Sequence, residues 1–127
     1  MTKLSEKQAE LFRGKNWGTV VTLRKDGSPH ATPVWIDTDG EHVLFNTRND
    51  RAKGRNLRTS PRASISVWDV SDPLRYTEFE GPVELTEEGA NEHIHELSRR
   101  YDGVDFHTPE NRVIVKLTPE RILDHGI

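Results

Sequence analysis

Apolar and polar residues alternate along several short segments, which is the pattern of β-strands that bury one face. The alternation is regular through Ala63, Ile65 and Val67, whose neighbours are small or amphipathic. Elsewhere β-branched and aromatic residues gather between turn-forming pairs. The strands predicted in this way cover Trp17–Arg24, His30–Asp37, His42–Thr47, Ala63–Trp68, Tyr76–Leu85, Val113–Leu117 and Arg121–Asp124.

Turn signals divide these strands. Asp26-Gly27 and Asp39-Gly40 are tight-turn pairs, so we expect the first three strands to form a meander. Asp72-Pro73 predicts a loop, and Gly81-Pro82 predicts a bulge or bend within its strand.

Helical periodicity occurs in three places. Ser5 and Gln8 have the spacing of a capping box, which predicts a helix over Ser5–Arg13. Asp50 is a candidate cap for a short helix over Arg51–Arg58. In the third helix we expect Thr86 as the cap, Glu87 and Glu88 in the first turn, and Gly103 at the end. Its apolar face is formed by Ala90, Ile94, Leu97 and Tyr101.

The strands come in meanders and do not alternate one for one with the helices. This order favours a mainly β fold, a small antiparallel barrel with helices at its ends, over a parallel α/β sheet. No segment resembles an interdomain linker, so residues 1–127 are interpreted as a single domain.

Composition adds an expectation about assembly. Residues of the AVILMFWYC set make up 32% of the 127 residues. With the 9 glycines the apolar share is about 39%, below the usual ~45–50%. Burial is inefficient in a chain of this size. We therefore expect a partner surface to complete the core, as in a homo-oligomer.

Several classes of protein are excluded or disfavoured. The absence of cysteine removes disulfide scaffolds, cysteine-based metal sites and thiol nucleophiles. The longest stretch without Asp, Glu, Lys or Arg is the ten residues Gly27–Ile36, whereas a spanning helix needs roughly 20. The first residues lack the apolar run of a signal peptide, so a cytoplasmic protein without membrane contacts is expected.

Positive charge is concentrated in one segment. Arg48–Arg62 holds six basic residues and one acidic residue, whereas the chain as a whole has a net charge of −3. A compact basic segment on an acidic protein favours one anionic ligand over a general polyanion surface. The alternative is a basic turn and short helix that are merely solvated.

Catalytic and metal motifs are poorly represented. His93 and His95 stand two positions apart on a predicted helix and point in different directions, so they are interpreted as solvated helix residues. No nucleophile elbow, phosphate-binding loop or zinc motif occurs. We therefore expect neither a catalytic side chain nor a metal site.

A phosphate site is the stronger hypothesis. Between Asn46 and Leu57 a strand is followed by a polar basic turn and the start of a helix. This arrangement gathers a hydroxyl from Thr47, backbone N–H groups, and cations from Arg51 and Lys53, all of which favour phosphate.

A strand just upstream offers a place for a flat heterocycle. Thr32-Pro33-Val34-Trp35 combines an amphipathic aromatic residue with Pro33, which donates no ladder hydrogen bond. The alternative is that Trp35 belongs to the core.

Three blocks of sequence carry a family resemblance: Asp26–Ile36, Asp39-Gly40 and Arg51–Ile65. They resemble the pyridoxamine 5′-phosphate oxidase-like superfamily, and most closely its deazaflavin-dependent branch, the flavin/deazaflavin oxidoreductases of the B type. The pairs Glu80-Gly81 and Arg100-Tyr101 fall in the expected order. The resemblance covers about Leu4 to Leu123.

The resemblance implies an antiparallel split β-barrel, the FMN-binding split barrel, which forms a homodimer with two cofactor sites at its interface. Arg51 and Lys53 would bind the cofactor phosphate. The other cofactor-binding candidates are Thr47, Asn46 and Asn56 near the phosphate, Thr32, Pro33, Val34 and Trp35 along the ring, and Trp68, Arg75 and Tyr76 from the second subunit.

The implied activity is hydride transfer between a deazaflavin, coenzyme F420, and a small conjugated or heteroaromatic substrate. Arg48, Arg55 and Arg58 would suit the acidic tail of that cofactor. FMN is the alternative cofactor, in an FMN-binding protein or FMN-dependent oxidase. A barrel that binds single-stranded nucleic acid and a haem- or cofactor-carrying module are remoter alternatives. Nucleic acid is disfavoured because the basic segment is short and the remainder of the chain is acidic.

Overall fold

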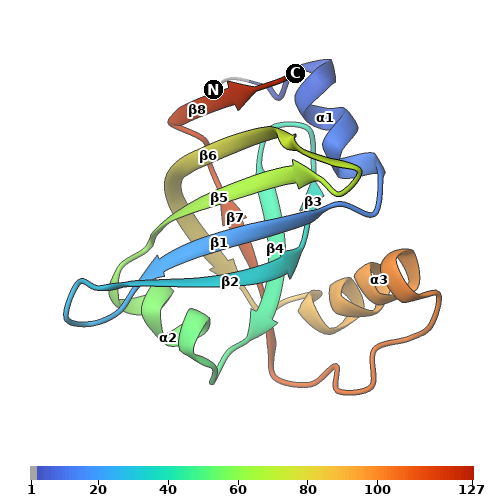
Figure 1. Ribbon diagram of the computed structural model, residues 1–127. Coiled ribbons are helices and arrows are strands. Elements are labelled where there is room, and N and C mark those ends of the chain that lie inside the picture. The colour runs from blue at the N-terminus through green and yellow to red at the C-terminus, as the bar shows by residue number, and fades with distance from the viewer. Residues whose placement is uncertain (1–2) are drawn as a thin grey trace.

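The computed structural model describes residues 3–127, which form a curled antiparallel sheet with three helices at its edges (Figure 1). The predicted strands and helices are present, with bounds that differ by a few residues. In chain order they are α1 (Glu6–Arg13), β1 (Trp17–Leu23), β2 (Pro29–Trp35), β3 (Asp37–Thr38), β4 (Val43–Arg48), α2 (Ala52–Thr59), β5 (Arg62–Asp69), β6 (Asp72–Thr86), α3 (Ala90–Asp102), β7 (Arg112–Leu117) and β8 (Arg121–His125).

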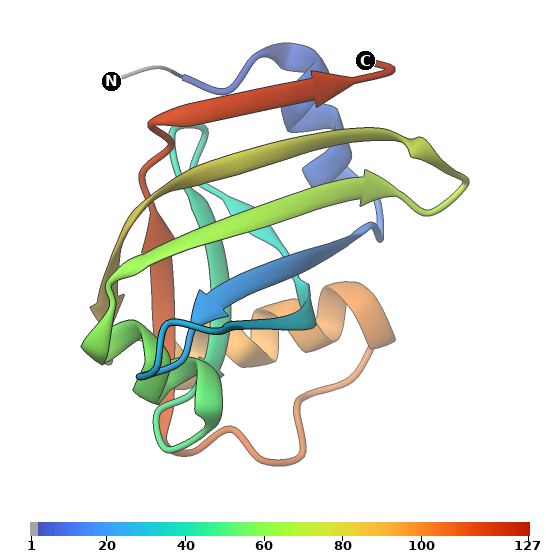
Figure 2. The ribbon, with the colours of Figure 1, turned by 60° about the vertical axis from the view of Figure 1, so that its left-hand side comes forward.

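The sheet order is β2-β1-β5-β6-β7-β4-β3, and β8 pairs with β6 beside this path. Only Ile36 separates β2 from β3 in the chain, yet these two strands lie at opposite ends of that order. The sheet therefore curls until its two ends meet, as Figure 2 shows. This architecture fits a split β-barrel.

The expected meander of the first three strands is only partly correct, because the Asp39-Gly40 turn joins β4 to the short strand β3 and not to β2. The hairpin of β1 and β2 is present, but β4 pairs with β3 and β7, and no ladder joins β4 to β2 in residues 3–127. We call this unpaired boundary between β2 and β4 the seam. Along it the backbone groups at the edge of β2 have no strand partner.

Strand β6 has two sets of partners because it bends. Its first part pairs with β5 and β8, and from Val83 onward it pairs with β7. The change occurs beside Gly81, where a Cβ atom would overlap the carbonyl oxygen of Thr118. Only glycine permits this approach, so the bend predicted at Gly81-Pro82 is confirmed.

The barrel interior is filled by alternate residues of the strands. On β5, Ala63, Ile65 and Val67 are buried, as the alternation predicts. The largest fully buried side chains include Phe45, Phe79, Ile36, Leu57, Ile65, Leu97 and Leu117. A second, smaller cluster under α3 contains Ile94, Leu97 and Tyr101, with Trp35 and Phe106 packed against it.

Helix ends confirm some sequence signals and correct others. Ser5 and Gln8 form the predicted capping box, and Gly103 ends α3 with a φ of 78°. Thr86 is not a cap, because it ends β6 and α3 begins only after Gly89, whose φ is 77°. Glu87 and Glu88 lie in the turn before the helix, since the strand persists longer than its sequence suggested.

Two further expectations are corrected. Asp72-Pro73 is not a loop, because β6 begins at Asp72 and the turn lies just before it. Asp50 is not the cap of α2; Arg51 occupies that position without a side-chain hydrogen bond. In residues 3–127 no helix has the length and apolar character needed to cross a membrane.

Candidate functional site

Two adjoining pockets open at the seam. The first, about 290 Å³, is lined by Asn46, Thr47, Arg48, Arg51, Phe106, His107, Thr108 and Arg112. The second, about 190 Å³, is lined by Trp17, Pro33, Val34, Trp35, Asn46, Ile94, Leu97, Phe106 and Arg112. Asn46, Phe106 and Arg112 border both pockets, so we treat them as two parts of one site. We call the first the cationic pocket and the second the aromatic pocket.

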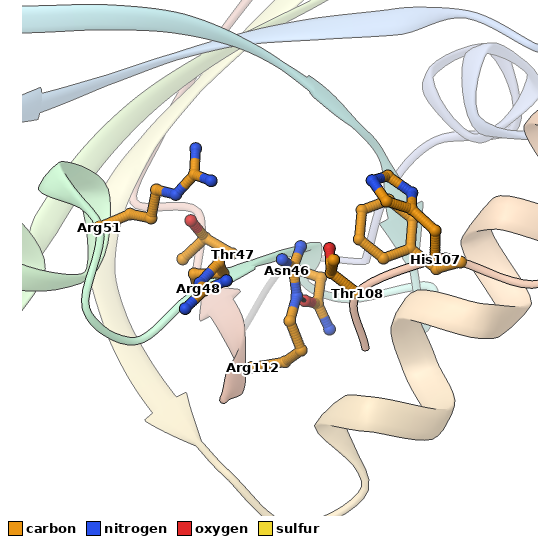
Figure 3. A pocket seen from close by; sticks show the side chains of 8 residues that line it. Asn46, Thr47, Arg48, Arg51, His107, Thr108 and Arg112 are labelled. Carbon is orange, nitrogen blue, oxygen red and sulfur yellow. Dashed lines mark hydrogen bonds between the residues drawn. The ribbon is translucent and has the colours of Figure 1, made fainter. Parts of the chain in front are cut away.

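The cationic pocket gathers positive charge from two distant parts of the chain. Figure 3 shows Thr47 and Arg51 on one side, while His107 and Thr108 enter from the segment between α3 and β7. Arg48 forms an ion pair with Asp50, with 3.0 Å between nitrogen and oxygen. Arg51 and Arg112 have no acidic partner among residues 3–127, so their charges remain available to a ligand.

Positive charges lie close together in and beside this pocket. Burial, with the nearby charges of Arg48 and Arg51, lowers the pKa of Arg112 to about 10. Lys53 lines neither pocket, but burial, with the charges of Arg112 and Arg51, also lowers the pKa of this candidate below its ordinary value. A phosphate or carboxylate bound next to these mutually repelling cations would neutralise their charge.

The turn from β4 into α2 is held by its own basic residues. Arg55 donates to the carbonyl oxygen of Asp50 (2.5 Å) and Arg58 to that of Asn49 (2.9 Å). A Cβ atom at Gly54 would lie 2.8 Å from the carbonyl oxygens of Arg48 and Asn49, so glycine lets α2 pack tightly against the turn. Arg55 and Arg58 thus support the turn and do not line the cationic pocket.

Arg112 connects the two pockets. Its Nε donates to Asn46 Oδ1 (2.8 Å), and its guanidinium carbon lies 5.0 Å from the centroid of the Phe106 ring. This cation–π contact and the hydrogen bond fix a cation between the basic residues and the aromatic wall. The sequence did not indicate Arg112 as a site residue, although Arg112 directly precedes the predicted strand Val113–Leu117.

The aromatic pocket is built on a preformed cluster. Trp35 stacks on Tyr101 and meets Phe106 edge to face, with centroids 6.0 Å apart. Ile94 and Leu97 of α3 complete the apolar wall. Trp35 was interpreted either as a wall for a flat heterocycle or as a core residue. Each interpretation is partly correct, because Trp35 packs in a hydrophobic cluster and also lines a pocket.

Thr32 is the ring-side candidate that neither pocket includes. It lies opposite Val20 in the hairpin, and its Oγ1 is buried without a hydrogen-bond partner in the described residues. Pro33, Val34 and Trp35 do line the aromatic pocket. The structure thus brings three of the four residues of this segment to the site.

Four other candidates lie away from the pockets of their own chain. Asn56 donates to Thr22 Oγ1 (3.0 Å) and attaches α2 to β1. Trp68 pairs in register with Tyr76, whose ring stacks on His125, and Arg75 forms an ion pair with Asp69 (3.0 Å). None of the four lines either pocket.

His93 was also misjudged from the sequence. It is not solvated but 8% exposed, and its Nε2 lies 3.1 Å from Asp37 Oδ2. His95 is half-buried, and its Nδ1 accepts a hydrogen bond from the Phe106 backbone N–H (3.1 Å). Both were misassigned because the segment between α3 and β7, and the short strand β3, fold back over the helix.

The site suits an anion attached to a flat ring. Within residues 3–127 no group of three or more His, Asp or Glu side chains could hold a metal ion. The cationic pocket supplies guanidinium groups and a hydroxyl, and the aromatic pocket supplies a planar wall. A phosphorylated heterocycle therefore matches the donors and shape of both parts.

A family model described as pyridoxamine 5′-phosphate oxidase matches residues 4–126 of the chain. Over 75 residues the chain is 36% identical to a pyridoxine/pyridoxamine 5′-phosphate oxidase from Gloeothece citriformis (strain PCC 7424). That match covers 58% of this chain and 34% of the relative, so the chain spans about a third of the relative's length.

Several solved structures are similar to this chain in fold. An F420 reductase has a TM-score of 0.83 and 30% identity, over 94% of this chain and 98% of that one. A conserved hypothetical protein from Mycobacterium tuberculosis has a TM-score of 0.76 and 29% identity, over 97% and 86% of the two chains. HutZ, the haem storage protein from Vibrio cholerae, has a TM-score of 0.73 at 16% identity over 99% and 97%, a likeness of fold alone.

Proposed function

Because the chain belongs to the pyridoxamine 5′-phosphate oxidase family, we propose that it transfers a hydride between bound coenzyme F420 and a small conjugated or heteroaromatic substrate. Arg51 and Arg112, which have no acidic partner among residues 3–127 and lie next to an aromatic pocket, carry this proposal. The F420 reductase of similar fold supports the choice of a deazaflavin.

Each part of the site has a definite role in this function. Arg51, Arg112 and Lys53 would bind the phosphate of the cofactor, with the Thr47 hydroxyl beside them. Pro33, Val34 and Trp35 would lie along the ring and exclude water from one side of it. A bound deazaflavin supplies the hydride chemistry itself, so the chain needs no nucleophile.

FMN is the second candidate cofactor. Arg55 and Arg58, which would suit a polyanionic tail, donate to carbonyl groups of the β4–α2 turn instead. Fewer cations are then left for a ligand that extends beyond one phosphate. This observation favours FMN, whose charge ends at its phosphate, and the activity would then be that of a flavin-dependent enzyme or an FMN-binding protein.

A paired titration of the purified, cofactor-free protein distinguishes these candidates. Coenzyme F420 and FMN are added separately, and binding is followed by cofactor fluorescence. Tighter binding of F420 is the expected result, and tighter binding of FMN would move the function to flavin chemistry. If neither binds at micromolar concentrations, the proposed oxidoreductase function is wrong.

We also propose that two copies of the chain form a homodimer. Apolar side chains are exposed on β6, on β8 and in the turn between β5 and β6, with Leu74 68%, Leu123 57% and Val70 48% exposed. Trp68, Arg75 and Tyr76 lie on β5 and β6 away from their own pockets, where they could reach the site of a second copy. Gel filtration with light scattering tests this, and a monomer at micromolar concentration would contradict it.

A further inference from the structure

His93 sits in a chain of hydrogen bonds whose donors and acceptors are fixed by their partners. The Asn46 amide nitrogen donates to the carbonyl oxygen of Ala90 (2.9 Å), which can only accept. Asn46 Oδ1 accepts from Arg112 Nε (2.8 Å), which can only donate. These two neighbours determine which way the Asn46 amide points.

The orientation of Asn46 in turn determines the protonation of His93. The same amide nitrogen lies 3.2 Å from His93 Nδ1, so Nδ1 must be the acceptor and carries no proton. The ring proton then sits on Nε2, which donates to Asp37 Oδ2 at 3.1 Å. The network is satisfied only by neutral His93 in this one tautomer.

We infer that His93 is a positioning residue: neutral His93 holds the Asn46 amide so that Arg112 lies between the two pockets, and protonation of His93 releases Arg112. A proton on Nδ1 would face the Asn46 amide hydrogens. If the Asn46 amide turned over to avoid this clash, its NH₂ group would face the Arg112 guanidinium. Its hydrogen bond to the carbonyl oxygen of Ala90 would also be lost. This rearrangement breaks the hydrogen bond that fixes Arg112.

The charged groups around His93 act in opposite directions. Asp37, on β3, favours the protonated ring, and Arg100 of α3 lies 3.3 Å from that carboxylate and weakens its effect. From β7, Arg112 opposes a positive charge on His93 through Asn46. Because Asp37 would neutralise a charged His93, the added proton contributes little attraction for an anion, and the displacement of Arg112 decides the outcome.

Nuclear magnetic resonance of the ligand-free protein tests the coupling directly. Histidine changes charge between about pH 5 and 8. Over this range the Asn46 side-chain NH₂ and the Arg112 Nε–H signals are expected to move with the midpoint of the His93 ring. In His93→Gln, whose amide can accept from Asn46 and donate to Asp37 but cannot be protonated, these signals stay constant.

Three results would overturn the inference. The Asn46 and Arg112 signals could remain constant while His93 titrates, they could move equally in His93→Gln, or His93 could fail to titrate in this range. The wild-type titration alone gives the first and third results. The test therefore does not depend on the variant being folded.

The consequence for binding rests on the proposed function and is measured separately. Affinities for coenzyme F420 and for FMN are compared at pH 8 and pH 5.5 in the wild type and in His93→Gln. The ligands' own titration affects both proteins, so the ratio of the two reports His93. We expect the wild type to lose about tenfold more affinity on acidification, the effect of one charge-assisted hydrogen bond.

The two experiments fail in different ways. If neither cofactor binds, the proposed function is wrong, and the resonance titration still decides whether His93 controls Arg112. If a cofactor binds and both proteins lose affinity equally, the role of His93 in positioning Arg112 for the ligand is refuted.

Discussion

The indole of Trp35 stacks on the ring of Tyr101, with centroids 5.2 Å apart and an angle of 13° between the planes. The Tyr101 hydroxyl donates to the carbonyl oxygen of Asn16 (2.6 Å) and accepts from the backbone N–H of Ile36 (3.1 Å). A single side chain thus attaches α3 to the segments that flank β1 and β2. The wall of the aromatic pocket is therefore held in place by contacts within the chain.

Tyr101→Phe should lower the free energy of unfolding by about 1–3 kcal/mol, because it leaves two buried backbone groups without their partner. The ring stack itself remains. Urea unfolding followed by tryptophan fluorescence measures the change. Tyr76→Phe is the matched control, since the Tyr76 hydroxyl has no hydrogen bond within the described chain. Equal losses in both variants would contradict the assigned role.

Lys53→Met should weaken cofactor binding by about 1.5–3 kcal/mol while leaving the unliganded protein as stable or more stable. Burial and nearby cations lower the pKa of Lys53, so its charge is a cost until an anion neutralises it. Cofactor fluorescence and urea unfolding measure the two effects. Lys25→Met, in the exposed β1–β2 turn, should change neither. Unchanged affinity in Lys53→Met would mean that this lysine does not interact with the bound cofactor.

Arg112→Gln should also weaken cofactor binding by about 1.5–3 kcal/mol, because it removes the cation shared by the two pockets. Arg112→Lys should recover only part of this, since an ammonium group lacks the planar fork of guanidinium. Isothermal calorimetry with the cofactor measures both variants. Arg121→Gln on the exposed strand β8 is the control and should bind normally.

Asp37 should make stability depend on acid. Burial alone would raise its pKa, but the hydrogen bond with His93 and the charge of Arg100 lower the pKa below its ordinary value of 3.8. A lowered carboxyl pKa contributes stability above the unfolded pKa, and this is lost as the pH falls through the folded pKa. Asp37→Asn should therefore unfold more readily than the wild type at neutral pH, and the difference should shrink below about pH 4.

Urea unfolding at several pH values measures this difference. Asp102→Asn, an exposed change at the end of α3, is the control and should track the wild type throughout. A gap between Asp37→Asn and the wild type that persists undiminished in acid would argue against an ionised Asp37 as its source.

Gly81→Ala should destabilise the fold by about 1–3 kcal/mol or more, because the added methyl group meets the Thr118 backbone. Gly14→Ala makes the same change where φ is −84° and the nearest atom is the Asn16 side-chain nitrogen at 3.1 Å, so it should cost less than Gly81→Ala. Thermal unfolding by circular dichroism compares them. Equal melting temperatures would show that β6 bends without this contact.

Local features of the fold could be predicted from the sequence. The capping box at Ser5 and Gln8, the turn at Gly27 and the helix end at Gly103 depend on residues a few positions apart. The phosphate-binding candidates Thr47 and Arg51 are only four positions apart, at the end of a strand and in the turn that follows it. Both line the cationic pocket. Features that depend only on residues near one another in the chain can be recognised from a single sequence.

Long-range partners could not be predicted in the same way. Strand β4 pairs with β7, where Asn46 lies opposite Ile114, and nothing in either segment specifies the other. That pairing brings Arg112 to Asn46 and to the two pockets, so neither segment alone could indicate that Arg112 lines the candidate site. His93 was judged solvated for the same reason, since its partner Asp37 lies 56 residues away.

The seam between β2 and β4 has a consequence for how such a protein can diversify. Across it the two halves of the barrel are joined by the chain at Ile36 and by side chains, with no ladder between β2 and β4. Substitutions that widen or narrow this opening alter no backbone pairing, so their cost in folding is limited to side-chain packing. A lineage can therefore exchange the molecules it accepts here while inheriting the same scaffold.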